Sequence, residues 1–333
     1  MKIVQLDAYA ANPGDISWDA WENITANGEK VEFIHYDLTD ACDVIERAKD
    51  AEMVLVNKVI IDDKVMSQLP KLRYVGVLAT GYNVVDTEAA RKRGIVVTNI
   101  PAYSTMSVAQ MVFAHLLNIT NRVQLHSDAV SSGKWQNNKC FTFWETPQLE
   151  LANLTIGIFG LGNTGTATAR IALAMGMKVL AYSSKEEAEI RRILGVAENC
   201  SCVCKAESKE QFFASSDVIS LHCPLTPATH HIINKETISM MKPSAILINT
   251  GRGPLIDEEA LAEALKEHRI YAAGVDVLTQ EPPKEGSPLI GLDNCFITPH
   301  IAWATSAARV RLLNVALDNV QAFLGGQPQN VVN

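Results

Sequence analysis

Short apolar runs recur along the chain and alternate with longer segments of helix-forming composition. In the N-terminal part these runs lie at Ile3–Leu6, Val31–Tyr36, Met53–Val56, Tyr74–Leu78 and Ile95–Thr98. The segments between them, such as 41–49 and 86–93, have a helix-like composition. Apolar runs of strand length that alternate with helices are typical of βαβ units. The pattern therefore predicts a parallel sheet with helices on both faces.

A second series of the same kind begins at Leu154. Its predicted strands are Thr155–Phe159, Lys178–Tyr182, Ser201–Cys204, Val218–Leu221, Ala245–Ile248, Ala272–Val277 and Phe296–Thr298. Helices are expected between them, for example over 166–175 and over 257–266, and a last long helix over 306–324. The predicted fold class is α/β, with two doubly wound parallel-sheet domains.

The segment between the two series has a different character. Residues 107–122 are apolar and helix-forming, whereas residues 131–150 are polar and contain four aromatic side chains, Trp135, Phe141, Phe143 and Trp144. We expect an irregular arm near 131–150. Exposed aromatic side chains favour a subunit interface, and hence a homodimer. The alternative is that the arm folds back onto its own domain.

Composition narrows the classes of function. The chain has 333 residues, 47% of them apolar and 20% charged, which favours two globular domains. The net charge of −8 argues against a general nucleic-acid or anionic-membrane surface, so an anionic substrate requires locally placed cations. No apolar run approaches the about 18 residues of a membrane span. The N-terminus reads as a strand and not as a signal peptide, so a cytoplasmic location is expected.

The seven cysteines do not suggest a disulfide framework. Cys200, Cys202 and Cys204 alternate along the chain, which allows either a metal site or one face of a strand. They lack the C-x-x-C pairs of common zinc sites, so we favour the strand. No other group of residues has metal-ligand spacing.

A glycine-rich turn follows the first strand of the second series. The stretch 154–165 runs from an apolar strand through Gly160-Leu161-Gly162-Asn163-Thr164-Gly165 into a helical segment. A G-x-G-x-x-G motif between a strand and a helix is a dinucleotide-binding signature. Gly160 permits the tight turn, Gly162 lets a pyrophosphate approach the backbone, and Gly165 lets the helix pack close to the strand.

Three further motifs follow in order. They are Ile248-Asn249-Thr250-Gly251-Arg252-Gly253, Gly274-Val275-Asp276-Val277-Leu278-Thr279-Gln280-Glu281-Pro282 and Thr298-Pro299-His300-Ile301-Ala302-Trp303. With the glycine loop, they make nearly the whole chain resemble the D-isomer-specific 2-hydroxyacid dehydrogenase family. The resemblance implies a Rossmann dinucleotide-binding domain, 104–296, inserted in a flavodoxin-like substrate domain, 1–103 and 297–333.

The resemblance also implies catalytic roles. Arg252 would hold the substrate carboxylate and carbonyl oxygen, since a guanidinium can make two parallel charged hydrogen bonds. His300 would be the general acid and base, and Glu281 would orient its ring and favour its protonated form. Backbone N–H groups of Thr80 and Gly81 would bind the substrate carboxylate.

The predicted dinucleotide contacts come from the glycine motif, from the resemblance and from positions after strand ends. They are Gly160, Gly162, Asn163, Thr164, Gly165, Ser183, Lys185, Cys223, Pro224, Thr250, Gly251 and Asp276. Ser183 stands where the family usually has an aspartate that binds the ribose hydroxyls. Without that carboxylate, and with Lys185 close by, the cofactor is either NAD or NADP.

Trp303 indicates one branch of this family. A tryptophan three positions after His300 resembles the glycerate dehydrogenase, or hydroxypyruvate reductase, branch, and a bulky wall there favours a small substrate. The expected reaction is hydride transfer between NAD(P)H and a small anionic 2-keto acid, hydroxypyruvate or glyoxylate. Two alternatives stay open: a dehydrogenase of another D-2-hydroxy acid, and a non-catalytic dinucleotide-sensing protein of the same fold.

Overall fold

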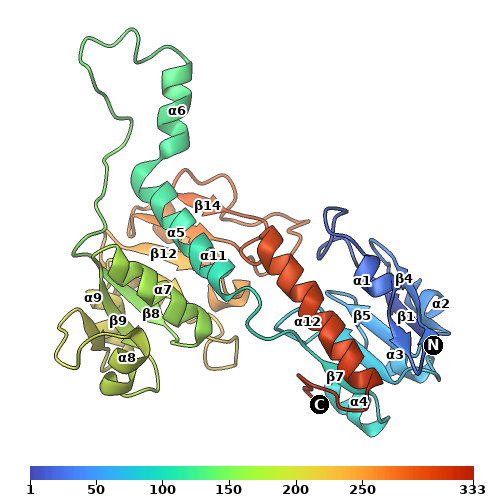
Figure 1. Cartoon of the computed structure of the whole chain (residues 1–333). Helices are drawn as coiled ribbons and strands as arrows, with labels where there is room; N and C mark the ends of the chain where they lie inside the picture. Colours follow the sequence, from blue (N-terminus) through green and yellow to red (C-terminus); the bar gives the residue numbers. More distant parts are fainter. The chain divides into compact units, whose positions relative to one another are not determined.

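The computed structural model describes all 333 residues, and the chain divides into two compact units (Figure 1). The first unit consists of Met1–Ser104 and Ala304–Asn333, and the second of Thr105–Trp303. Each unit is built on its own parallel sheet, which confirms the predicted α/β class.

The first unit contains a five-stranded parallel sheet in the order β4-β1-β5-β6-β7. Its strands are β1 (Lys2–Gln5), β4 (Glu32–His35), β5 (Met53–Val56), β6 (Tyr74–Val77) and β7 (Val96–Thr98), and a small hairpin joins β2 (Thr25–Ala26) to β3 (Glu29–Lys30). Its helices are α1 (Asp19–Glu22), α2 (Val44–Ala48), α3 (Asp63–Ser67), α4 (Thr87–Lys92) and α12 (Ser306–Leu324).

Apolar side chains hold this unit together. Every residue of β5 and β6 is buried, as expected for central strands covered on both faces. The C-terminal helix α12 packs on this sheet, where the rings of Phe323 and Tyr74 lie 4.9 Å apart. The last helix of the chain therefore completes the core of the first unit.

The second unit contains a seven-stranded parallel sheet in the order β10-β9-β8-β11-β12-β13-β14. Its strands are β8 (Thr155–Phe159), β9 (Lys178–Tyr182), β10 (Val203–Lys205), β11 (Val218–Leu221), β12 (Ile246–Asn249), β13 (Ala272–Val275) and β14 (Cys295–Ile297). Its helices are α5 (Thr105–Asn121), α6 (Val123–Ser131), α7 (Asn163–Ala174), α8 (Glu187–Leu194), α9 (Lys209–Ser215), α10 (Lys235–Ser239), α11 (Glu258–Lys266) and the short 3₁₀ helix η1 (Gly253–Leu255).

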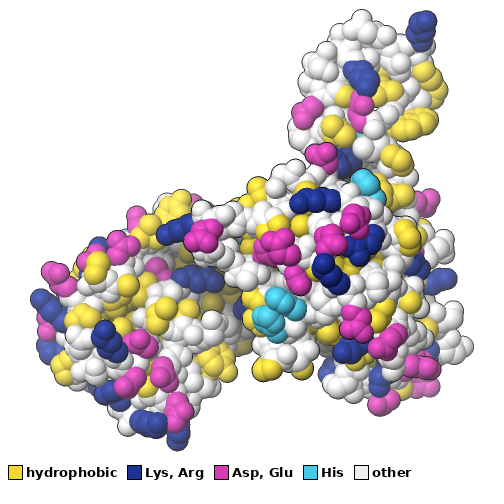
Figure 2. Space-filling view, turned by 180° about the vertical axis from the view of Figure 1, so that it is seen from behind, with side chains coloured by type: hydrophobic (Ala, Val, Ile, Leu, Met, Phe, Trp, Pro, Cys, Tyr) yellow, Lys and Arg dark blue, Asp and Glu magenta, His cyan; other side chains and the backbone are white.

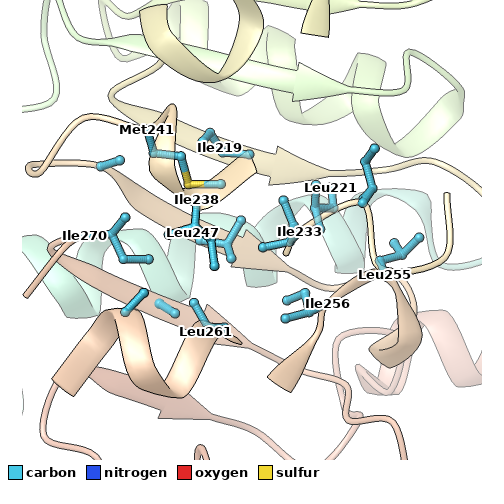
Figure 3. Close-up of a cluster of buried hydrophobic side chains, with 14 of the residues drawn as sticks. Ile219, Leu221, Ile233, Ile238, Met241, Leu247, Leu255, Ile256, Leu261 and Ile270 are labelled. Atoms are coloured by element: carbon cyan, nitrogen blue, oxygen red, sulfur yellow. The ribbon is translucent and has the colours of Figure 1, made fainter. Parts of the chain in front are cut away.

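The order of these strands marks the place where a ligand is expected in the second unit. The chain leaves β8 toward β9 and β10, then returns to β11 on the other side of β8. In open α/β sheets ligands bind at the carboxyl ends of the strands where the order reverses. Buried side chains such as Ile219, Leu221 and Leu247 fix β11 and β12 next to this point (Figure 3). Because β14 pairs with β13, the boundary between the units lies at 303–304, after this strand and its loop and not at 296–297.

An arm projects from the body of the second unit (Figure 1). It consists of α6, which contains no buried residue, and the irregular segment 132–150 that returns to the sheet. The helix α6 was not predicted. It is separated from α5 by Arg122, which adopts a left-handed conformation with φ of 48°. Figure 2 shows hydrophobic side chains gathered on the arm, where Trp135, Phe141 and Trp144 are 50%, 85% and 67% exposed.

The strand predicted over Ser201–Cys204 is only partly correct. β10 begins at Val203, so only Cys204 of the three alternating cysteines belongs to it. Cys200 and Cys202 precede the strand and their sulfur atoms form a disulfide. None of the helices is both long enough and apolar enough to span a bilayer.

Candidate functional site

The glycine-rich turn has the geometry that each glycine was predicted to supply. Gly160 adopts a φ of +99°, and a Cβ there would lie 2.8 Å from the backbone nitrogen of Cys223. A Cβ on Gly165 would lie 2.1 Å from the carbonyl oxygen of Gly160, so only glycine allows α7 to approach β8 this closely. A Cβ on Gly162 would meet no atom within 4 Å. The backbone at Gly162 therefore faces open space.

The N-terminus of α7 lies at this open space. The helix begins at Asn163, three residues earlier than predicted, and its N-cap Gly162 provides no side-chain hydrogen bond. The N–H groups of Asn163 and Thr164 have no hydrogen-bond partner within the protein. Free N–H groups and the positive end of the helix dipole favour a phosphate. The turn thus fits the pyrophosphate of a dinucleotide.

Ser183 and Lys185 follow the end of β9, the strand next to β8. The Ser183 hydroxyl accepts a hydrogen bond from the backbone N–H of Lys185 at 3.2 Å. The Lys185 ammonium lies 3.8 Å from the Glu189 carboxylate, one turn along α8. No acidic residue occupies the first position after β9, and the lysine has only a loose, partly exposed partner there.

Three other predicted dinucleotide contacts lie at neighbouring strand ends. Cys223 lies against Gly160, and burial raises the pKa of its thiol to about 11, so the thiol is protonated at neutral pH. Pro224 follows it and is exposed at the same strand end. The hydroxyl of Thr250, after β12, is buried and has no partner within the protein. Such an orphaned polar atom is one that a bound ligand can satisfy.

Arg252 is presented by a turn that Asn249 shapes. The Asn249 side chain is fully buried at the end of β12, donates to the carbonyl oxygen of Arg252 at 2.9 Å and accepts from the N–H of Gly251 at 3.0 Å. The Arg252 side chain is exposed and donates to the Gly251 carbonyl oxygen at 2.8 Å. It forms no ion pair with a carboxylate of the protein, so its charge is available to an external anion.

His300 and Glu281, which lie 19 residues apart in the sequence, meet in the second unit. The Nδ1 atom of His300 lies 2.6 Å from the Glu281 Oε2 atom. The other carboxylate oxygen of Glu281 accepts from the N–H of Leu278 at 2.9 Å, which fixes the carboxylate. A carboxylate accepts only, so Nδ1 of His300 carries a proton, and Nε2 is left as the atom that can exchange a proton with a substrate.

The Asp276 carboxylate is hydrogen-bonded to the loop that carries His300. This carboxylate is 1% exposed and accepts from the Thr298 hydroxyl at 2.6 Å and from the N–H groups of Ile301 and Ala302 at 2.9 and 2.8 Å. The expected contact with the nicotinamide amide would have to be added to these three hydrogen bonds. Trp303, the last residue of the unit, is half-buried just beyond this loop.

Thr80 and Gly81 lie in the first unit, at the end of β6. The Thr80 hydroxyl donates to the Ile100 carbonyl oxygen at 2.9 Å, and the Thr80 carbonyl oxygen accepts from Asn99 at 2.8 Å. These bonds fix the Thr80 loop to residues 99 and 100, which follow β7. The N–H groups of Thr80 and Gly81 have no partner within the protein, as the predicted carboxylate-binding role requires.

Three residues of this site were not predicted from the sequence. Asn249 and Thr298 lie inside motifs that were recognised, so their polar side chains at strand ends were a usable signal. His115 lies on the apolar helix α5 and bonds to Thr298 at 3.0 Å. A single histidine on an apolar helix gives no signal of this partner, which lies 183 residues away.

The chain is similar to known proteins over its full length. Residues 113–302 match the family model described as D-isomer specific 2-hydroxyacid dehydrogenase, NAD binding domain. The chain is 46% identical to a hydroxypyruvate reductase from Blautia hydrogenotrophica over the full length of both chains.

Solved structures share the fold over the whole chain. An acyclic imino acid reductase (Bsp5) in complex with NADPH and D-Arg is 29% identical, with a TM-score of 0.82 and complete coverage of both chains. A D-lactate dehydrogenase with NAD⁺ from Lactobacillus jensenii is 27% identical, with a TM-score of 0.78 and complete coverage of both chains.

Proposed function

The chain belongs to the D-isomer-specific 2-hydroxyacid dehydrogenase family, and from this premise we propose that it reduces hydroxypyruvate to D-glycerate, with glyoxylate as a second substrate. The family membership implies a nicotinamide dinucleotide as cofactor. The substrate proposal is supported by the 46% identical hydroxypyruvate reductase and by the half-buried Trp303 beyond the His300 loop.

In this proposal the residues of the chain bind, orient and protonate the keto acid. Arg252 holds the carboxylate and the keto oxygen, and the N–H groups of Thr80 and Gly81 hold the carboxylate. The bound dinucleotide supplies the hydride. His300 donates the Nε2 proton to the oxygen as negative charge develops there, and Glu281 orients the ring through its contact with Nδ1.

One observation carries the proposal more than any other. The His300–Glu281 pair at 2.6 Å engages Nδ1 and leaves Nε2 for a substrate, in the same unit as an arginine that has no carboxylate partner. An acid for the oxygen and a cation for the carboxylate are the two groups that reduction of a 2-keto acid requires. Both follow strands of the sheet that carries the glycine turn.

The test is loss of turnover in two variants. We expect wild-type protein to oxidise NAD(P)H in the presence of hydroxypyruvate, followed by absorbance at 340 nm. His300→Gln should lower kcat by about 10²-fold or more, the usual contribution of a general acid. Arg252→Gln should raise KM for hydroxypyruvate and lower kcat/KM by a similar factor. Unchanged turnover in either variant would contradict the assignment.

The chain is proposed to accept NADPH as well as NADH. Ser183 supplies no carboxylate to repel a 2′-phosphate, and Lys185 is a cation that its partner Glu189 holds only loosely, at 3.8 Å. Restoring the acid in Ser183→Asp should lower kcat/KM for NADPH relative to NADH by about tenfold or more, the effect of one charge repulsion of about 1.4 kcal/mol. An unchanged ratio would show that residue 183 does not contact the ribose.

The arm is proposed to join two copies of the chain. Its helix α6 buries nothing within its own unit, and Val123, Trp135 and Phe141 are 70%, 50% and 85% exposed. Exposed aromatic side chains in one segment are typical of interfaces. Light scattering should give the mass of a dimer for the wild type and of a monomer for Trp135→Ser combined with Phe141→Ser.

A further inference from the structure

A hydrogen-bonded chain runs from the buried helix α5 to the loop of His300. The Nε2 atom of His115 lies 3.0 Å from the Thr298 hydroxyl, which lies 2.6 Å from the Asp276 carboxylate. That carboxylate accepts from the N–H of Ile301, and the Asp276 carbonyl oxygen accepts from the N–H of His300 at 2.8 Å. We infer that His115 and Thr298 are positioning residues for His300. This inference rests on the proposed function of His300.

The direction of the hydrogen bonds in this chain is fixed by chemistry. The Asp276 carboxylate can only accept, so the single hydroxyl proton of Thr298 points to it. The oxygen of Thr298 must then accept from His115, which requires a proton on Nε2. His115 is therefore held as the Nε2–H tautomer. Burial lowers its pKa, although the charge of Asp276 opposes this, so the ring is neutral at pH 7.

The sheet makes room for the His115 ring at one position. A Cβ on Gly274, in the middle of β13, would lie 2.7 Å from the Cβ of His115 and 3.0 Å from its Nδ1 atom. The glycine lets α5 bring the imidazole against the strand that leads to Asp276. His115 itself is 4% exposed, so it has no access to a substrate and can act only through its partner.

The backbone of His300 needs such support. Its φ of 54° lies in the left-handed region, which costs a residue with a side chain free energy unless the surroundings hold it there. Hydrogen bonds from its N–H to the carbonyl oxygens of Asp276 and Thr298, at 2.8 and 2.9 Å, hold this conformation. Removing the Thr298 hydroxyl loosens Asp276, and thereby the loop that sets the imidazole opposite Glu281.

The experiment compares two substitutions of Thr298. Thr298→Val keeps the shape and removes the hydroxyl, whereas Thr298→Ser keeps the hydroxyl. We expect Thr298→Val to lower kcat for hydroxypyruvate about tenfold, with KM for the dinucleotide and the keto acid within about twofold of wild type, since misplacing a catalytic group reduces turnover more than binding. Thr298→Ser should restore kcat.

The role of His115 is tested by coupling. His115→Leu should lower kcat by a similar factor, and the double variant His115→Leu with Thr298→Val should be no slower than the worse single variant, because both break one chain. Thr120→Val is the matched control. It removes another buried hydroxyl from α5, one that bonds to the Leu116 carbonyl oxygen of its own helix, and should leave kcat unchanged.

A second readout does not depend on turnover. The NMR signal of the His300 ring, identified by its loss in His300→Gln, should shift or broaden in Thr298→Val and keep its wild-type position in Thr298→Ser and Thr120→Val. Multiplicative losses in the double variant, or wild-type kcat and ring signal in Thr298→Val, would overturn the inference. If wild-type protein reduces no keto acid, the proposed function fails, and the ring signal still decides whether Thr298 positions His300.

Discussion

Both units contain a parallel sheet flanked by helices, but the residues after the first strand differ in chemistry: they present free hydrogen-bond donors in one unit and an acidic side chain in the other. In the second unit β8 leads into a glycine turn, and the N–H groups of Asn163 and Thr164 at the start of α7 are left without partners. In the first unit β1 leads to Asp7, which is 7% exposed. One unit leaves backbone donors for an external anion, and the other supplies its own anion.

Asp7 satisfies the turn that follows β5. Its carboxylate accepts from the N–H groups of Asn57, Lys58 and Val59 at 2.7, 2.6 and 3.0 Å. Burial raises the pKa of this carboxyl, and the three backbone hydrogen bonds act in the opposite direction. A phosphate has no free donors at that turn. Two parallel α/β sheets thus leave free backbone donors at a strand end in one unit and build an internal brace in the other, so function has to be argued from the strand ends and not from the fold.

The largest expected effect comes from filling the open space in the second unit. Gly162→Val introduces a side chain where a Cβ meets no protein atom and where φ is −81°, so the variant should fold. The side chain keeps the pyrophosphate from the free N–H groups. Losing about two charged hydrogen bonds corresponds to about 3 kcal/mol, or roughly a hundredfold weaker binding.

Fluorescence titration with NADH and NADPH measures this loss of affinity. A thermal unfolding curve close to that of wild type is the control for folding. Wild-type affinity in a folded Gly162→Val would mean that the dinucleotide does not lie on this turn, and the contrast between the two units would lose its functional meaning.

The next largest effect is expected from removing the Asp7 carboxylate in the first unit. Asp7→Ala leaves three backbone N–H groups without their acceptor, and we expect the free energy of unfolding to fall by about 2 kcal/mol. Dinucleotide affinity should stay unchanged. Urea unfolding measures the first effect and fluorescence titration the second. Asp37→Ala, which removes an exposed carboxylate of the same unit, should have little effect on stability. Equal stability of the Asp7 and Asp37 variants would show that Asp7 is no brace.

The glycine turn of the second unit could be predicted from the sequence, but the Asp7 brace of the first unit could not. The glycine turn was predicted because it depends on local residues: a strand, three glycines and a helix that follow one another. Strands such as β5, β8 and β11 were predicted with the correct ends, since continuous apolar runs mark central strands. The brace at Asp7 was not predicted, because its partners at 57–59 lie about 50 residues away in the sequence, in the turn after another strand.

Other features escaped prediction for the same reason. The arm helix α6 begins after a left-handed Arg122, a conformation that no local rule assigns to arginine. The pairing of Cys200 with Cys202 depends on a turn before β10, where alternation alone predicted a strand. His115 was indistinguishable from a core residue until the fold placed Thr298 beside it.

The smallest expected effect concerns the buried titratable groups of the two units. Burial raises the pKa of Asp7 but lowers that of His115, because in each case the charged form is disfavoured. A histidine whose pKa is lower in the folded than in the unfolded protein stabilises the fold fully above about pH 6.5, and this contribution is lost as the pH falls toward the folded pKa. The second unit should therefore lose stability with acidification partly through His115.

The corresponding measurement is urea unfolding of wild type and His115→Leu at pH 7.5 and pH 5.5. The free energy of unfolding of wild type should fall more than that of the variant over this interval, since only the wild type has to take up this proton on unfolding. The sign is the decisive point. If the two proteins lose stability in parallel, the His115 ring takes up its proton equally well in the folded state, and the neutral Nε2–H tautomer that orients Thr298 is not the form that the core holds.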